Sequence, residues 1–242
     1  MEKNYTALGL MSGTSMDGVD ASTIFSDGNT GVVTSIKNQY FEYDKDLYQK
    51  LTNLRDKITN SKDLKNLFDD LNSIEKEITL FHAKIVNEMI QSHSKFEIDL
   101  VGFHGQTIFH NAEEKTSVQL GDGKLLSQLI KKKVVYNFRQ NDLKNGGQGA
   151  PLTPIFHQNL LRNINLEWWP VVALNIGGIS NATSVSRVYP SNLTDDNKDY
   201  KLFAEDIGPG NCLIDEWIRK NSKYRYDKDG LIAKSGKVNE LI

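Results

Sequence analysis

The sequence between residues 7 and 20 reads Ala7-Leu8-Gly9-Leu10-Met11-Ser12-Gly13-Thr14-Ser15-Met16-Asp17-Gly18-Val19-Asp20. A short apolar run ends in a loop of Gly, Ser, Thr and Asp, and a second apolar run over 19–25 follows at once. This pattern predicts two strands joined by a tight turn. Two glycines and three hydroxyls would gather backbone N–H groups and short donors at one point, which suits a phosphate. From the residues alone, an ordinary Gly/Ser hairpin turn explains the stretch equally well.

The loop is not a Walker motif, because it lacks the Gly-Lys-Ser/Thr ending and no helix follows it directly. It resembles the phosphate hairpin of the actin-like sugar kinases, in which the loop joins two antiparallel strands. The resemblance predicts ATP as a ligand at this hairpin.

Length and composition describe a globular chain without a basic or acidic bias. The chain has 242 residues, enough for one large domain or two small ones, of which 38% are hydrophobic and 25% charged. The formal net charge is −2, so charge balance gives no sign of a nucleic-acid or membrane partner.

Cysteine usage and the termini bear on the compartment. Cys212 is the only cysteine, which excludes an intramolecular disulfide and fits a reducing cytosol. Because it lies beside Leu213 and Ile214, we expect a buried structural thiol there rather than a nucleophile. The N-terminus lacks a signal pattern and no apolar run is long enough to span a membrane, so we expect a cytoplasmic protein.

The first half of the chain alternates strand and helix patterns. Apolar runs predict a meander over 7–11, 19–25 and 31–43, and further strands over 98–103, 117–120 and 134–138. An apolar stripe from Leu64 to Met89 predicts one long helix capped by Asn60 or Ser61, with His82 and His93 at solvated positions. A shorter helix is expected over 125–130. This alternation predicts an α/β fold whose sheet contains parallel strands and crossover helices.

The second half repeats the opening pattern after a break. The glycine cluster over 145–151 is the best candidate for a hinge. A helix over 154–162 follows, and residues 171–183 again read as strand, Gly/Ser/Asn loop and strand. We expect a further strand over 201–204, a helix over 212–220 and a helix start over 236–242. Two such strand–loop–strand units on either side of a hinge predict two lobes with a nucleotide between them.

Six segments together resemble one family, the anhydro-N-acetylmuramic acid kinases. They occur in the family's order, span nearly the whole chain and are far more specific together than any one alone. The segments are 9–20, Gly102-Phe103-His104-Gly105-Gln106-Thr107-Ile108, Val118-Gln119-Leu120-Gly121, Phe138-Arg139-Gln140-Asn141-Asp142 continuing through Gly146-Gly147-Gln148-Gly149-Ala150-Pro151-Leu152, Leu174-Asn175-Ile176-Gly177-Gly178-Ile179-Ser180-Asn181 and Asp206-Ile207-Gly208-Pro209-Gly210-Asn211.

The resemblance implies an actin-like (ribonuclease H-like) two-lobed α/β fold. We expect an N-terminal lobe over 1–153 and a partial second lobe over 154–242. It also implies that ATP phosphorylates O6 of 1,6-anhydro-N-acetylmuramic acid while water opens the 1,6-anhydro bridge. The products are N-acetylmuramic acid 6-phosphate and ADP, a step of peptidoglycan recycling. Mg²⁺ is expected because phosphoryl transfer needs a cation to offset charge on the transferring group.

By this resemblance Asp206 is the catalytic base. The reaction needs a group that draws a proton from water as it attacks the anomeric carbon, and Asp206 matches the family's aspartate ahead of Gly-Pro-Gly-Asn. The glycines and proline let the backbone turn at a helix start, where N–H groups are free. Read alone, Asp206 would more simply be a turn or capping residue. Glu205 should point to the opposite face of the strand.

The same resemblance distributes ligand contacts over three further groups. Asp17 would help to place Mg²⁺, although a turn-forming Asp before Gly18 is the structural alternative. Arg139 suits a carboxylate best, because its planar fork can bind two oxygens, and Asp142 is either its ion-pair partner or a helix cap. The residues assigned to the ATP phosphates are Gly13, Thr14, Ser15, Met16, Asp17, Gly18, Val19 and Asp20, together with Gly177, Gly178 and Ser180. The residues assigned to the amino sugar are His104, Gln106, Arg139, Gly208 and Asn211. Of these, His104, Gln106 and Arg139 are expected at strand ends on one side of the sheet.

The chain departs from the family in its ending, because family members continue well past the segment matching 234–242. The absent portion completes the second lobe and part of the adenosine pocket. Two readings follow: a kinase, alone or with a separate C-terminal polypeptide, or a noncatalytic remnant or sugar- or nucleotide-binding module. A general actin-like sugar kinase explains neither Gly-Gln-Gly-Ala-Pro nor Gly-Pro-Gly-Asn. The resemblance also suggests a homodimer.

Overall fold

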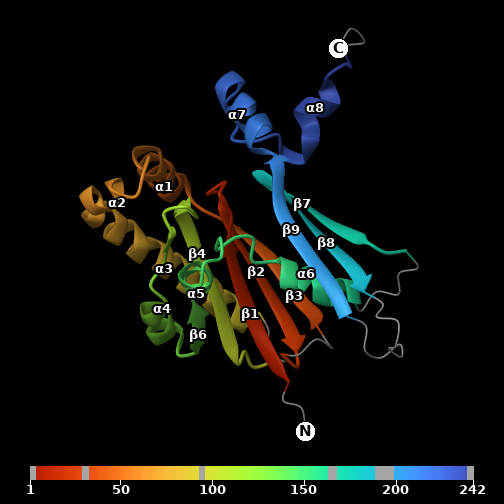
Figure 1. The fold of residues 1–242 in the computed structure, drawn as a ribbon. Coiled ribbons are helices and arrows are strands. Elements are labelled where there is room, and N and C mark those ends of the chain that lie inside the picture. The colour runs from red at the N-terminus through yellow and green to blue at the C-terminus, as the bar shows by residue number, and fades with distance from the viewer. Residues whose placement is uncertain (1–3, 29–32, 93–95, 163–167, 189–198, 239–242) are drawn as a thin grey trace. The chain divides into compact units, whose positions relative to one another are not determined.

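The computed structural model describes residues 4–28, 33–92, 96–162, 168–188 and 199–238 (Figure 1). The chain divides into two compact units, Met1–Leu166 and Glu167–Ile242. Each unit has its own sheet.

The first unit opens with the predicted meander. Strand β1 (Tyr5–Ser12) pairs antiparallel with β2 (Gly18–Ser26), which pairs antiparallel with β3 (Val33–Glu42). Side chains alternate between buried and exposed along the first part of β1, as expected for a strand with one face on the core. The opening hairpin is therefore confirmed.

The rest of the sheet is parallel at its centre. Strand β4 (Leu100–Asn111) lies parallel to β1 and to β6 (Lys133–Tyr136), whereas β5 (Thr116–Leu120) pairs antiparallel with β4. The order is β3-β2-β1-β4-β5, with β6 also paired to β4. Three antiparallel strands followed by parallel strands confirm the α/β class that the alternation predicted, and they agree with the ribonuclease H-like arrangement that the family resemblance implies.

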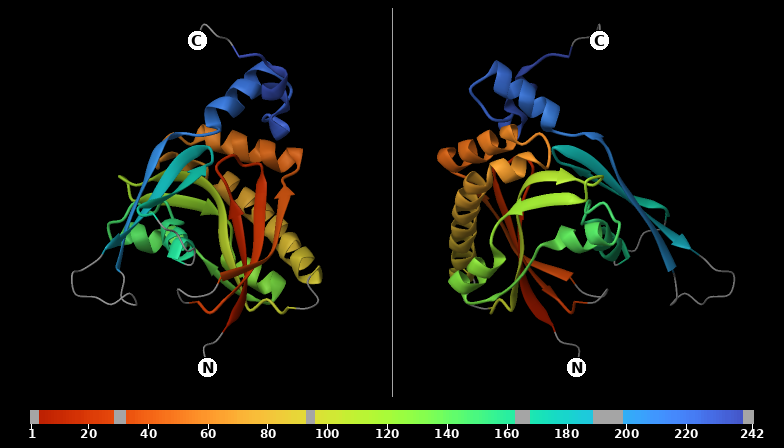
Figure 2. Two further views of the ribbon diagram at one scale, coloured as in Figure 1. Left: turned by 90° about the vertical axis from the view of Figure 1, so that its right-hand side faces the viewer. Right: turned by 60° about the vertical axis from the view of Figure 1, so that its left-hand side comes forward.

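Helices form a layer beside this sheet (Figures 1 and 2). They are α1 (Lys45–Lys57), the one-turn α2 (Asp63–Asn66), α3 (Phe68–Gln91) and α4 (Gly123–Ile130). The apolar stripe predicted a single helix from residue 64, but the helix is interrupted at Leu67. The residue directly before α2 is Lys62, and of the two expected caps Asn60 takes part: its Oδ1 accepts the amide of Lys62 (3.0 Å), while the Asp63 carboxylate accepts the amides of Thr59 and Asn60.

The core lies between α3 and the sheet. Its residues include Ile78, Ile85 and Met89 of α3 and Leu8 and Val101 of the strands. His82 lies on the same face and is fully buried, so its predicted solvated position is wrong. A histidine can be buried there because both ring nitrogens find hydrogen-bond partners. His93 falls outside the described residues.

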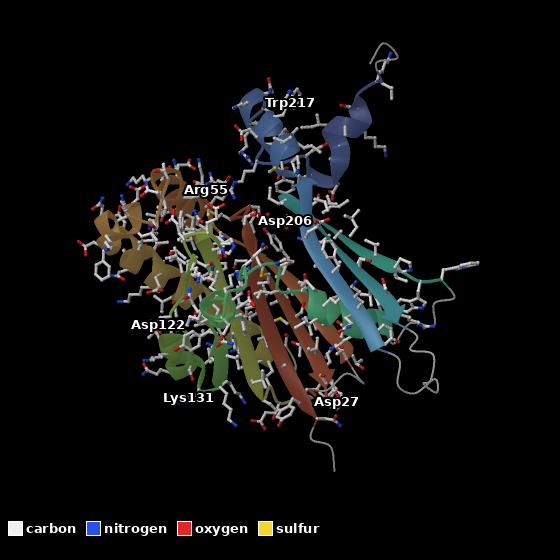
Figure 3. The ribbon with its side chains drawn as sticks, in the orientation of Figure 1. Asp27, Arg55, Asp122, Lys131, Asp206 and Trp217 are labelled. Atoms are coloured by element: carbon white, nitrogen blue, oxygen red, sulfur yellow. The ribbon has the colours of Figure 1, made fainter. Side chains whose placement is uncertain are left out.

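Two short helices follow the central strands. Helix α4 starts at Asp122, whose carboxylate accepts the amides of Lys124 and Leu125 (Figure 3). Helix α5 (Phe138–Lys144) has no counterpart among the expected elements: Asn137 is left-handed (φ 63°) and ends the strand predicted over 134–138. Arg139 therefore lies in the first turn of a helix and not at a strand end. Helix α6 (Pro154–Arg162) matches its prediction.

The second unit is a three-stranded antiparallel sheet with helices at one end. Strands β7 (Val171–Ile176), β8 (Ile179–Val188) and β9 (Asp199–Pro209) lie in that order. They confirm the second predicted hairpin. Helices α7 (Cys212–Asn221) and α8 (Leu231–Ser235) follow, with a 3-10 turn over Lys228–Gly230. The helix expected from residue 236 is wrong within 236–238, and 239–242 lie outside the described residues.

Several apolar side chains of this unit are exposed, among them Leu174, Ile176, Phe203 and Trp217 (59% exposed, Figure 3). Cys212 is half-buried, whereas its neighbours predicted a buried thiol. Helix α7 exposes Leu213 and Ile214 beside it.

A kink at Gly105 lets β4 change partners. On one edge of β4, residues up to Phe103 pair with β6 and residues from Gln106 onward pair with β5, whereas on the other edge β4 stays paired with β1 up to Gln106, opposite Ser12. Gly105 has a φ of +73°, and a Cβ there would lie 2.5 Å from the carbonyl oxygen of Leu120. The position therefore demands glycine for both its backbone conformation and its space.

We expect Gly105→Ala to lower the free energy of unfolding by more than about 2 kcal/mol, because the left-handed conformation alone costs roughly 1–2 kcal/mol and the clash adds to it. Gly28→Ala is the matched control, since Gly28 has the same φ of +73° with nothing within 4 Å of an added Cβ. Urea unfolding measures both. Equal losses in the two variants would contradict the role of the Leu120 contact.

Candidate functional site

The turn between β1 and β2 is fixed by backbone bonds and by one buried side chain. The amide of Met16 donates to the carbonyl of Gly13 (3.2 Å), and the amide of Tyr43 donates to that of Asp17 (2.8 Å). Met16 is left-handed (φ 58°) and only 2% exposed, so its side chain anchors the loop in the core. Thr14 and Ser15 remain exposed. A loop held in this way presents short hydroxyls on a fixed backbone.

Carboxylates flank the same turn. The Ser15 hydroxyl donates to the Asp17 carboxylate. Burial raises the pKa of Asp20, and the negative charge of Asp17 raises it further. Gly18 and Val19 are buried at the start of β2, and a Cβ on Gly18 would lie 2.3 Å from the Phe41 carbonyl oxygen. Two neighbouring carboxylates suit Mg²⁺, which takes one or two from a protein and the rest of its ligands from phosphate and water.

The structure brings Gln106 to the opening hairpin. Its side-chain amide donates to the Gly13 carbonyl (2.8 Å), across the boundary between β4 and β1. Gln106 is fully buried, and its Oε1 is buried without a hydrogen-bond partner. Gln106 therefore supports the loop with one end and offers an acceptor with the other.

Sequence reasoning missed three buried polar residues beneath this loop: Ser12, Tyr43 and His82. The Ser12 hydroxyl lies 3.0 Å from the Tyr43 hydroxyl and 3.4 Å from His82 Nε2. One signal was available for His82, because it lies four residues after Ile78 and three before Ile85, on the apolar stripe of α3.

His104 and Arg139 form the second polar cluster. Arg139 donates from one terminal nitrogen to His104 Nε2 (2.8 Å) and from the other to the Gly149 carbonyl (2.7 Å). His104 Nδ1 lies 2.7 Å from the Gly105 carbonyl, so Nδ1 carries the proton and Nε2 accepts. Burial, and secondly the Arg139 charge, lower the pKa of His104 to about 4. Both ring nitrogens are thus engaged, and His104 orients Arg139.

Arg139 has no anionic partner among the residues that the structure describes. Its Nε is buried without a hydrogen-bond acceptor, and burial lowers the pKa of the guanidinium. Asp142 is not its ion-pair partner: the Asp142 carboxylate accepts the amide of Gly149 (2.7 Å) and so ties the glycine loop to α5. A buried guanidinium without an anionic partner is suited to bind an anionic ligand.

A cavity of about 330 Å³ opens beside this cluster. The side-chain amide of Gln119 donates to the Ser117 hydroxyl, and that of Gln140 donates to the Ser117 carbonyl (both 2.7 Å). An aromatic ring, amides and an ammonium group line it, a mixture typical of polar ligand sites. The lining includes Phe103, His104, Gln119, Tyr136, Gln140 and Lys144.

In the second unit, the loop between β7 and β8 is bonded to the start of α7. The Gly177 carbonyl accepts the amide of Asn211 (2.7 Å), and the Gly178 carbonyl accepts those of Gly210 (2.9 Å) and Cys212 (3.3 Å). Three N–H groups at this helix start, those of Gly210, Asn211 and Cys212, are therefore used internally. The sequence-based expectation that the N–H groups here are free is wrong for these three.

Asp206 lies on β9 opposite Asn181, next to an irregularity in the pairing with β8 (Figure 3). Ser180 pairs with Gly208, so Ile207 is the extra residue of a bulge. Asp206 and Glu205 are both exposed, and Ser180 is buried. The bulge places Gly208 and the Gly177–Gly178 loop at the same end of the sheet as Asp206.

The described residues hold neither a cluster of metal ligands nor a membrane-spanning helix. No three His, Cys, Asp or Glu side chains gather there as a metal cluster. Within the same ranges, no helix combines the length and apolar character needed to cross a membrane.

The mixed sheet order and the two glycine-loop hairpins define an actin-like α/β protein of the sugar kinase type. The family model described as anhydro-N-acetylmuramic acid kinase matches residues 5–242. The chain belongs to this family.

Three relatives named anhydro-N-acetylmuramic acid kinase show how far the similarity extends. One from Pelagibacter ubique (strain HTCC1062) is 56% identical over 242 residues, which cover 100% of this chain and 61% of the relative. One from Agrobacterium fabrum is 40% identical over 96% of this chain and 60% of its own length. One from Brucella canis is 38% identical over the same shares. The chain thus spans about three fifths of the length of the relatives it matches.

We expect the free energy of unfolding to fall as the pH is lowered from 6.5 to about 4. Burial lowers the pKa of His82 and of His104 to about 4, from 6.5. In this window the unfolded chain binds protons that the folded chain does not, so each histidine removes up to about 3 kcal/mol of stability. Urea unfolding at stepped pH measures the loss.

The matched variant is His82→Gln, which removes one of the two titrating groups. Between pH 6.5 and about 4, this variant should lose less free energy of unfolding than the parent chain, by up to about 3 kcal/mol. An unchanged pH dependence in this variant would show that His82 does not contribute.

Proposed function

We propose that this chain carries the chemistry of an ATP-dependent anhydro-N-acetylmuramic acid kinase. The reaction adds water across the 1,6-anhydro bridge and transfers the γ-phosphoryl group of ATP to O6, giving N-acetylmuramic acid 6-phosphate and ADP. It serves peptidoglycan recycling and amino sugar catabolism. The observation that supports this proposal is the family match over residues 5–242.

The opening hairpin would hold the phosphates. Its fixed turn offers the exposed hydroxyls of Thr14 and Ser15 beside backbone N–H groups. Gly177, Gly178 and Ser180 would form the second phosphate loop. Asp17, with Asp20 nearby, would hold Mg²⁺, whose charge offsets that of the transferring phosphoryl group. Phosphoryl transfer depends mainly on such positioning and charge compensation.

Asp206 would act as the general base. It takes the proton from water as the water oxygen bonds to the anomeric carbon, while the bond from that carbon to O6 breaks. The released O6 then bonds to the γ-phosphorus, and the bond to ADP breaks. An exposed carboxylate on a strand held by the neighbouring bulge is suited to this step.

Arg139 would bind the carboxylate of the sugar's lactyl group. Its buried Nε and the lack of an anionic partner among the described residues support this assignment. His104 would orient Arg139, and the unpartnered Oε1 of Gln106 would accept a hydrogen bond from the sugar. Gly208 and Asn211, beside the second loop, complete the assigned sugar contacts.

The setting of the enzyme is proposed from the same resemblance. We assign residues 1–153 to the N-terminal lobe and 154–242 to the second lobe, in the cytoplasm. ATP and the amino sugar are the ligands, with a homodimer and a separate C-terminal polypeptide as further partners. A noncatalytic sugar- or nucleotide-binding module is the alternative function.

We expect Asp206→Asn to lower kcat about 10²- to 10⁴-fold, because the amide has nearly the same shape but cannot take the proton. A coupled assay of ADP release with 1,6-anhydro-N-acetylmuramic acid measures the rate. Glu205→Gln is the matched control on the adjacent position of β9 and should stay near the parent rate.

Equal losses in the two variants would remove Asp206 from the role of base. Absence of sugar-dependent ADP release from the parent chain, both alone and with the remainder of a relative supplied, would overturn the kinase proposal. Binding of Mg·ATP without turnover would favour the binding module.

We expect Arg139→Lys to weaken binding of 1,6-anhydro-N-acetylmuramic acid about 10- to 100-fold, the effect of losing one charge-assisted hydrogen bond. Affinity for 1,6-anhydro-N-acetylglucosamine, which lacks the lactyl carboxylate, should not change. Calorimetric titration with each sugar measures the two affinities separately. Arg55→Lys, at an exposed position of α1 (Figure 3), is the control. Equal weakening for both sugars would contradict the carboxylate assignment.

A further inference from the structure

Three buried polar side chains meet beneath the opening hairpin, and none of the proposed catalytic steps uses them. Ser12 is the last residue of β1, Tyr43 follows β3, and His82 lies in the middle of α3. They are at most 1% exposed. Placing three polar groups in an apolar core is costly unless each one is hydrogen-bonded.

The direction of each hydrogen bond follows from chemistry. His82 Nδ1 lies 2.8 Å from the Ile78 carbonyl, which can only accept, so Nδ1 carries the proton. Burial lowers the pKa of His82 to about 4, so the ring is neutral and Nε2 is an acceptor. Ser12 must then donate its single proton to Nε2, over a long 3.4 Å. The Tyr43 hydroxyl, whose pKa burial raises, therefore donates to Ser12 (3.0 Å).

These hydrogen bonds fix both ends of the loop over 13–17. Ser12 stands immediately before the loop, and the backbone amide of Tyr43 binds the carbonyl of Asp17 at its far end (2.8 Å). Tyr43 thus holds one end with its backbone and the other with its hydroxyl. Its ring is fixed against Phe81, and that of His82 against Phe103, each at 4.9 Å between centroids.

We propose that Tyr43, Ser12 and His82 are positioning residues of the phosphate site: a directed chain of hydrogen bonds holds the hairpin in the shape that receives phosphate. The inference rests on the proposed function only for the identity of the ligand. The hydroxyls of Thr14 and Ser15 gain a fixed location, so less conformational entropy is lost when a phosphate binds.

Native-state hydrogen exchange of the full chain tests the positioning role without any nucleotide. We expect Tyr43→Phe and His82→Leu to speed exchange of the Met16 and Tyr43 amides about tenfold or more, the effect of losing one hydrogen bond. His82→Gln keeps a side-chain acceptor for Ser12 and should restore slow exchange in comparison with His82→Leu.

Thr79→Val is the matched control. Thr79 is a fully buried hydroxyl on the same helix, but it binds the amide of Asp122 at the start of α4 and the carbonyl of Glu75. It should lower global stability without a selective effect on the hairpin amides. The proposal would be overturned if the hairpin amides exchanged equally fast in Tyr43→Phe and Thr79→Val while the two variants had the same global stability.

Calorimetric titration with Mg·ADP then tests the link to the ligand. Tyr43→Phe should weaken the affinity about tenfold and Thr79→Val should leave it unchanged, for the same loss of one hydrogen bond. If the parent chain binds no Mg·ADP, the proposed phosphate function fails, while the exchange result still decides the positioning role. If Tyr43→Phe speeds hairpin exchange but leaves the affinity for Mg·ADP unchanged, the hydrogen bonds among Tyr43, Ser12 and His82 do not position phosphate.

Discussion

The candidate site of the first unit depends on the kink of β4 at Gly105. Up to Phe103 the strand belongs to the parallel centre of the sheet, and from Gln106 it pairs antiparallel with β5. The two residues beside the kink serve different parts of the site. His104 binds Arg139 at the start of α5, whereas Gln106 binds the carbonyl of Gly13 in the hairpin. A left-handed glycine is the backbone feature that allows one strand to supply both.

A neutral histidine is used in the same way at two places. In His82 and in His104, Nδ1–H donates to a backbone carbonyl and Nε2 accepts, from the Ser12 hydroxyl in one case and from Arg139 in the other. A carboxylate in place of His104 would neutralise Arg139. A neutral imidazole orients the guanidinium and leaves its charge for a ligand, at the cost of burying a cation without a counterion among the described residues.

The parts of the structure that depend on local sequence could be predicted, and those that depend on distant partners could not. Both hairpins follow from apolar runs broken by glycine. The family motifs single out Arg139 and Asp206, whose roles stay predictions. The solvated position expected for His82 was wrong because its partner Ser12 lies 70 residues away. The strand over 134–138 extended too far because apolar Phe138 continues the pattern, whereas left-handed Asn137 has already ended it.

In the second unit, two motifs that are separate in the sequence form one structural element. The carbonyls of Gly177 and Gly178 accept the amides of Gly210, Asn211 and Cys212 at the start of α7, so these three donors are not free to bind a phosphate. Gly210 is required because a Cβ would lie 2.1 Å from the Gly177 carbonyl oxygen. The bulge at Ile207 joins the same contact to the strand that carries Asp206. Backbone hydrogen bonds therefore join the Gly177–Gly178 loop, which is the proposed second phosphate loop, to the segment that follows the proposed base Asp206.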